Sequence, residues 1–162
     1  MPKRVGTPPS APSGGSEGSR GTPPDAPGSG RSSAVTSWDA TTEFASDTEE
    51  SDGTYASTGT DENAVHVSDG SVVLHNPTVT RSSGESSGGD NSSCYGVGAA
   101  ILTTGGTSYI DGGTVTSDAD GGAGIFSYGD GVTNVADTAI TTTGSTAGAI
   151  YVAGAVRCTP TM

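Results

Sequence analysis

Short apolar segments recur along the second part of the chain at nearly constant spacing. Each has one apolar anchor followed two positions later by a small or β-branched residue, an alternation typical of a β-strand with one buried face. The anchors are Val65, Ile101, Ile125 and Ile150, which lie 36, 24 and 25 residues apart. Repeats of this length indicate stacked supersecondary units.

The longer first interval has a local cause. Residues Arg81–Ser93 (RSSGESSGGDNSS) form a polar stretch without a periodic apolar position. Removing about a dozen residues there restores the shorter interval, and an insertion between turns of a solenoid leaves the stack undisturbed. We expect this insertion to form a surface loop, which is also an alternative contact site for a partner.

Each repeat contains three strand-like pieces separated by Gly or Asp, for example Ala100–Thr103, Ser108–Ile110 and Thr114–Thr116. A single coil cannot bury its apolar face alone, so stacking aligns the inward positions into ladders. The pattern predicts an all-β fold, a parallel β-helix (solenoid) of about 3–4 coils over residues 49–162 with the last coil incomplete. A β-sandwich is the rival because Asp-Gly pairs also suit hairpin turns, but sandwich strands have no reason to repeat at a fixed period.

Composition separates residues 1–48 from the repeats. Seven of the nine prolines lie in residues 1–36, where GTPPSAP (Gly6–Pro12) recurs as GTPPDAP (Gly21–Pro27). Pro, Gly and Ser offer few apolar side chains to bury. We expect a disordered Pro/Gly/Ser-rich spacer, which is either a stalk that holds a domain away from a surface or a tail without a task.

Charge is distributed unevenly along the chain. Residues 1–36 carry +2, so the remainder carries −14 within a total of −12. Such a surface repels phosphates, so we expect no nucleic-acid partner. The sequence contains no run of 18 apolar residues, which predicts no membrane insertion. The basic N-terminus lacks an apolar segment and is no secretory signal, so the protein is either cytoplasmic or starts upstream of Met1.

The repeats between Asp61 and Thr142 resemble bacterial right-handed β-helix proteins, the pectin-lyase-like or adhesin-like Gly/Thr-rich surface repeats. The resemblance covers about residues 53–153. It implies a right-handed coil, in agreement with the crossover rule, and a secreted or cell-surface location. It does not specify an activity, because adhesins, autotransporter passengers and polysaccharide lyases share this coil.

The chain offers little catalytic chemistry. The enzymes that the resemblance brings in cleave acidic polysaccharide with clustered aspartates beside a Lys, Arg or His. Here no Lys follows Lys3, and Asp111 and Asp137 lie near equivalent positions without an aspartate column to continue them. Asp118–Gly121 resembles the opening of a calcium loop but lacks its later ligands. We therefore expect no catalytic residues, no metal site and no cofactor.

One column of side chains directly follows the anchors and should point outward from the coil: His66, Leu102, Phe126 and Tyr151. Apolar and aromatic side chains in a row on a solvated face mark a contact patch. Aromatic rings also suit sugar faces or protein partners. The alternative is that outward positions tolerate any residue and that the insertion covers some of them.

These patterns predict a non-catalytic, adhesin-like structural and binding module, extracellular or on the cell surface, with a glycan or protein surface as partner. The alternative is a fragment of a carbohydrate-active β-helix enzyme whose catalytic coils lie beyond Met162. A third interpretation is a truncated frame that makes no functional protein. Cys94 and Cys158 are either one disulfide or two unrelated thiols.

Overall fold

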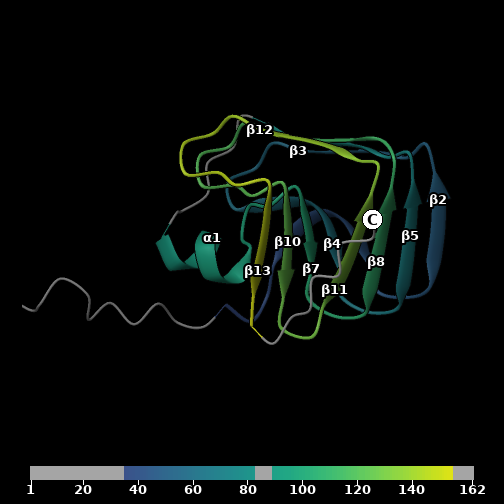
Figure 1. The fold of residues 1–162 in the computed structure, drawn as a ribbon. Coiled ribbons are helices and arrows are strands. Elements are labelled where there is room, and N and C mark those ends of the chain that lie inside the picture. Colours follow the sequence, from purple (N-terminus) through teal and green to yellow (C-terminus); the bar gives the residue numbers. More distant parts are fainter. Residues whose placement is uncertain (1–34, 83–88, 155–162) are drawn as a thin grey trace, which may run out of the picture. The chain divides into compact units, whose positions relative to one another are not determined.

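The structure, a computed structural model, describes residues 35–82 and 89–154. Most of the expected spacer (residues 1–34), part of the insertion (83–88) and residues 155–162 lie outside these ranges. Within them the strands follow one another in coils of three (Figure 1). The first coil holds β1 (Asp39–Phe44), β2 (Thr48–Ser51) and β3 (Thr54–Ser57), and the second holds β4 (Glu62–Val67), β5 (Ser71–His75) and β6 (Thr78–Arg81). The helix α1 (Gly89–Tyr95) follows, and the third coil holds β7 (Ile101–Thr103), β8 (Thr107–Asp111) and β9 (Thr114–Ser117). The fourth coil holds β10 (Ile125–Tyr128), β11 (Val132–Ala136) and β12 (Ala139–Thr142), and β13 (Ile150–Ala153) starts another turn.

Strands of successive coils pair in parallel and form three sheets among the described residues. Sheet A has the order β1-β4-β7-β10-β13, sheet B the order β11-β8-β5-β2 and sheet C the order β12-β9-β6-β3. In sheet A, Val65 pairs with Ile101, Ile101 with Ile125, and Ile125 with Ile150. The predicted all-β parallel solenoid, with about four turns, is therefore confirmed. Its right-handed sense stays a prediction.

The core fills the inside of the coil. In the second and third coils, inward residues of all three sheets are fully buried, among them Val65, Ile101, Leu74, Ile110, Val79 and Val115. A polar layer lies among them in the third and fourth coils, where four hydroxyls are linked at 2.6 to 3.1 Å: those of Thr103, Ser108, Ser127 and Thr133. Each of these buried hydroxyls has a partner, which removes the cost of burying it.

The corners between the sheets explain why Gly, Asp and Asn recur between the strands of each repeat. The corner between sheets B and C needs a left-handed backbone in every coil, with φ of 56°, 49°, 73° and 47° at Asp52, Asn76, Gly112 and Asp137. Asp, Asn and Gly adopt this conformation most readily. The corner between sheets A and B needs glycine for space, because a Cβ on Gly106 would lie 2.2 Å from the carbonyl oxygen of Gly70.

The coils begin earlier in the chain than the sequence indicates. From the sequence the spacer extends to residue 48, but β1 already starts at Asp39 and pairs with β4. The strand escapes detection because Thr42 occupies the position taken by Val65 in the next coil. The next strand, β2, has the sequence Thr-Glu-Glu-Ser and carries no apolar residue at all. The predicted boundary between spacer and coils is therefore wrong.

Candidate functional site

The predicted outward column is in register but is not a surface patch. His66 pairs with Leu102, Leu102 with Phe126, and Phe126 with Tyr151 on neighbouring strands. His66, Leu102 and Phe126 are nevertheless buried, whereas Tyr151 is 39 % exposed. The expectation of an exposed contact row is therefore wrong at three of its four positions.

A cover from outside the repeat buries this column. Trp38 packs on His66 and on Tyr128, with ring centroids 5.7 and 5.6 Å apart. Tyr95, the last residue of α1, packs on Tyr128 at 5.4 Å. The indole Nε1 of Trp38 donates a hydrogen bond of 2.8 Å to the carbonyl of Tyr95. The segment before β1 and α1 thus meet over sheet A and exclude water from His66, Leu102 and Phe126.

Side chains of the second coil fasten the end of the insertion. Asn63 Nδ2 donates 2.9 Å hydrogen bonds to the carbonyls at both ends of the segment Gly96–Ala99. Arg81 Nε donates to the carbonyl of Gly98 at 3.2 Å. Arg81 is fully buried, and this desolvation lowers the pKa of its guanidinium although carboxylates such as that of Glu62 act in the opposite direction. The single mid-coil cation of the sequence is thus a structural residue.

His66 lies under the cover with incomplete hydrogen bonding. Its Nε2 is 2.8 Å from the hydroxyl of Thr104. Its Nδ1 is buried, has no hydrogen-bond partner among the described residues, and lies 3.9 Å from a carboxylate oxygen of Glu43. Burial lowers the pKa of the imidazole below 6.5, and the charge of Glu43 opposes this shift. Folding therefore favours the neutral imidazole.

The outer face of sheet B carries an exposed tyrosine. Tyr109 on β8 is 43 % exposed, and the parallel register sets it beside Asn134 on β11. Two residues further along β8, the same register sets Asp111 between His75 on β5 and Ala136 on β11. Tyr109 and Asp111 share one face because alternate side chains of a strand point the same way.

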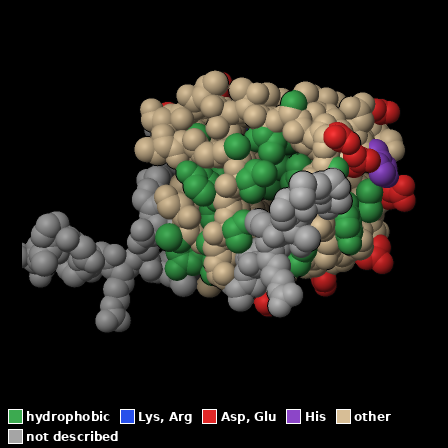
Figure 2. Space-filling model, viewed as in Figure 1, with side chains coloured by type: hydrophobic (Ala, Val, Ile, Leu, Met, Phe, Trp, Pro, Cys, Tyr) green, Lys and Arg blue, Asp and Glu red, His purple; other side chains and the backbone are tan. Residues whose placement is uncertain are grey.

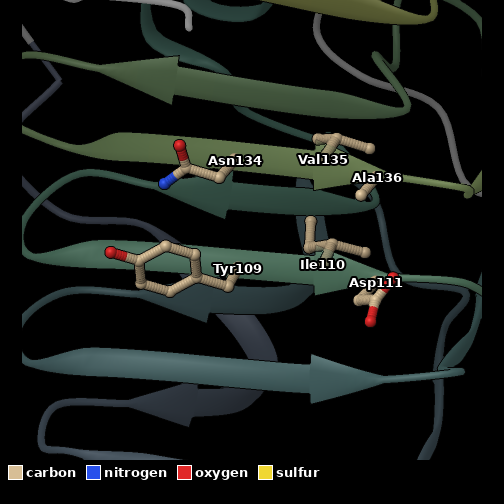
Figure 3. A pocket seen from close by; sticks show the side chains of 6 residues that line it. All are labelled: Tyr109, Ile110, Asp111, Asn134, Val135 and Ala136. Atoms are coloured by element: carbon tan, nitrogen blue, oxygen red, sulfur yellow. The ribbon is translucent and has the colours of Figure 1, made fainter. Parts of the chain in front are cut away.

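A shallow hollow of about 150 Å³ lies between these two rows of side chains (Figure 3). We call it the Tyr109 groove. Its lining residues are Tyr109 and Asn134 on one side, Asp111 and Ala136 on the other, and Ile110 and Val135 between them. Positions two apart on a strand are separated by roughly 7 Å. The groove is therefore about as wide as one small ring.

A second titratable side chain borders the groove. His75 Nδ1 lies 3.7 Å from a carboxylate oxygen of Asp111, and His75 Nε2 lies 3.4 Å from a carboxylate oxygen of Glu49. All three side chains are largely exposed to water, which screens such pairs and makes them weak. The two carboxylates remain available to a ligand.

The surface around the groove is acidic. Arg81 is the one Lys or Arg of the described residues, and it is buried. Figure 2 shows Asp and Glu side chains together with a His on the side where Figure 1 labels β2 and β5, and this face shows no Lys or Arg. The described surface thus offers a ligand carboxylates, amides, hydroxyls and an aromatic ring.

Sequence reasoning missed the Tyr109 groove although part of its signal was present. Alternation within Thr107–Asp111 already sets Tyr109 outward, between the inward Ser108 and Ile110. An outward aromatic ring offers apolar surface to a ligand. Its neighbour Asn134 needed the exact register of β8 and β11, which the structure supplies.

Two further observations concern the cysteines and the helix. Cys94 on α1 is exposed and free, and its possible partner from the sequence, Cys158, lies outside the described residues. No helix within the described ranges is long and apolar enough to cross a membrane.

Comparison of the chain with protein-family models, with curated proteins and with solved structures found no match. The architecture therefore rests on the structure: a parallel β-solenoid with a cover over His66, Leu102 and Phe126 of sheet A and a groove on sheet B.

Proposed function

We propose that the chain is a non-catalytic, adhesin-like binding module, secreted or displayed on a cell surface, that contacts a glycan through the Tyr109 groove. The observation that supports this proposal is the placement of Tyr109. Its ring is exposed on an ordered sheet, beside the amide of Asn134 and two residues from the carboxylate of Asp111. Tyr109 stays exposed, whereas His66 and Phe126 on the outer face of sheet A are buried.

The chemistry of the groove suits a sugar. A sugar ring has an apolar face that buries well against an aromatic ring, while its hydroxyls require hydrogen-bonding groups at the edge. The groove supplies both kinds of contact from neighbouring strands, β8 and β11. Because these strands are held by parallel pairing on a stacked core, little conformational freedom is lost when a ligand binds.

The openness of the groove favours binding over catalysis. His75 and Asp111 form a His–carboxylate pair of the kind that acid–base catalysis uses. The pair is exposed, however, and the described lining residues come from one sheet face, so none of them excludes water around a reacting bond. A fragment of a carbohydrate-active enzyme remains the alternative, and it is the weaker explanation of this groove.

Substitution of the tyrosine tests the proposal. We expect the purified chain to bind at least one polysaccharide of a broad immobilised panel. Tyr109→Ala should lower the affinity at least tenfold, about 1.4 kcal/mol, because the stacking surface is removed. Tyr109→Phe should bind as the wild type because it keeps the ring.

Tyr151→Ala is the matched control, since Tyr151 is a similarly exposed tyrosine on sheet A. It should leave the affinity unchanged. Failure of the wild type to bind any member of the panel, or equal binding by Tyr109→Ala, would contradict the proposal.

A further inference from the structure

The Tyr109 groove carries enough chemistry to define the class of its ligand. We propose that it takes a single uncharged pyranose ring of a glycan, stacked on Tyr109 and hydrogen-bonded to Asp111 and Asn134, and that it discriminates against uronic, sialylated and sulfated sugars. This inference rests on the proposed function and specifies the charge and the size of the sugar that binds.

The size of the groove sets the number of rings. Its volume is about 150 Å³, and an enclosed cavity of that volume holds one benzene molecule. A pyranose has the same number of ring atoms and is larger through its hydroxyls. Because the groove is open to solvent, these hydroxyls can project out of it. One ring therefore lies between Tyr109 and Asp111, and the neighbouring sugars of the glycan lie outside.

The polar groups at the two sides of the groove match a ring that carries hydroxyls. The carboxylate of Asp111 is an acceptor and takes hydroxyl protons, whereas the amide of Asn134 both donates and accepts. Tyr109 and Asn134 come from paired positions on β8 and β11, so stacking and hydrogen bonding act on the same ring. Ala136, opposite Asp111, is small enough to leave the carboxylate accessible.

Charge then excludes acidic sugars. Asp111 forms one side of the groove, and Glu49 lies close by on the far side of His75. Arg81, the one Lys or Arg of the described residues, is buried and does not line the groove. A ligand carboxylate or sulfate would lose water and meet like charge, and the described part of the chain offers no cation at the groove to compensate it. An uncharged ring has no charge to desolvate and is not repelled by these carboxylates.

A pair of polymers that differ only in charge provides the test. A neutral hexose polymer is compared with the same polymer after its C6 hydroxymethyl groups have been oxidised to carboxylates, at pH 7.5 and in 20 or 500 mM NaCl. We expect the neutral polymer to bind with less than twofold change between the two salt concentrations. The oxidised polymer should bind at least tenfold more weakly at low salt. In the double variant Glu49→Gln/Asp111→Asn, the affinities for the neutral and the oxidised polymer should differ less than they do in the wild type.

The outcomes separate the two proposals. Equal or tighter binding of the oxidised polymer that is lost in Tyr109→Ala would overturn the inferred selectivity and leave the proposed function standing. Affinity for the neutral polymer that falls steeply with salt would also overturn it, because contacts with an uncharged ring are not screened. Failure to bind any polysaccharide of the broad panel would overturn both proposals.

Discussion

Single residues decide which part of this solenoid is covered and which is open. Phe126 and Tyr109 are both aromatic side chains on the outer face of a coil, yet Phe126 is fully buried and Tyr109 is 43 % exposed. The segment that follows the insertion packs on Phe126, where a Cβ added to Gly96 would lie 2.7 Å from its ring. Residues remote in the repeat pattern therefore determine exposure. The register of the outward column could thus be predicted from the sequence, whereas its coverage was one of two alternatives that the sequence left open.

The buried His66 makes the stability of the fold depend on pH. Because burial lowers the pKa of its imidazole below 6.5, the unfolded chain binds a proton at a higher pH than the folded chain does. Its contribution to stability is therefore fully present above pH 6.5 and is lost as the pH falls through the folded pKa. We expect the free energy of unfolding in urea to decrease from pH 7.5 to pH 5.5, and this decrease to be smaller in His66→Gln.

The second histidine serves as the control for this prediction. His75 lies on sheet B, outside the cover, so His75→Gln is measured beside His66→Gln. A profile that flattens in His75→Gln and persists in His66→Gln would show that the buried imidazole is not responsible.

At the scale of elements, the sequence predicts those strands that carry an apolar anchor. The strands β4, β7, β10 and β13 contain Val65, Ile101, Ile125 and Ile150 at matching positions. The first coil has no such anchor, because Thr42 takes the position of Val65 and β2 has no apolar residue. Its inward apolar residues are Phe44 at the end of β1 and Tyr55 on β3. The short helix α1 was expected as part of a loop, since Gly89–Tyr95 has no helical apolar period.

The insertion is held by named hydrogen bonds, which can be removed. Asn63→Ala deletes both bonds to the carbonyls at the ends of the segment Gly96–Ala99 and leaves these carbonyls without that donor. We expect a loss of about 2 kcal/mol in the free energy of unfolding. Amide hydrogen exchange should also accelerate in Gly96–Ala100 more than in β8, because the insertion loosens before the stack does.

Asn134→Ala is the control, since Asn134 is an outward-facing asparagine on β11. It should change stability by less than about 0.5 kcal/mol. If both variants lose the same stability, or if exchange in Asn63→Ala rises equally throughout, the insertion is not fastened as described.

At the scale of the whole molecule, a polar, Gly-rich chain folds because its coils share one core. No coil buries its apolar residues alone, and stacking joins Val65, Ile101 and Ile125 into one interior file. The same stacking builds the Tyr109 groove, whose lining residues lie on β8 and β11, one coil apart. The stacked strands that hold the groove could therefore be predicted from the sequence. Which outer face is exposed could not, because it depends on the segments that cover sheet A.

In-register stacking can be tested by disulfide trapping on the outer face of sheet C. Thr80, Thr116 and Thr141 are paired in turn across the second, third and fourth coils. Paired positions of neighbouring parallel strands are about 4.8 Å apart, which suits a disulfide. The control pair, Thr114 with Thr141, is displaced by two residues and lies about 8 Å apart.

With Cys94 and Cys158 replaced by Ser, we expect Thr80→Cys/Thr116→Cys and Thr116→Cys/Thr141→Cys to form an intramolecular disulfide under mild oxidation, and Thr114→Cys/Thr141→Cys to remain reduced. The first pair is the most direct measurement, because it closes across the insertion only if the second and third coils stack as like on like. Failure of that pair to close, or equal closure of the displaced pair, would contradict the parallel, in-register stack on which the groove depends.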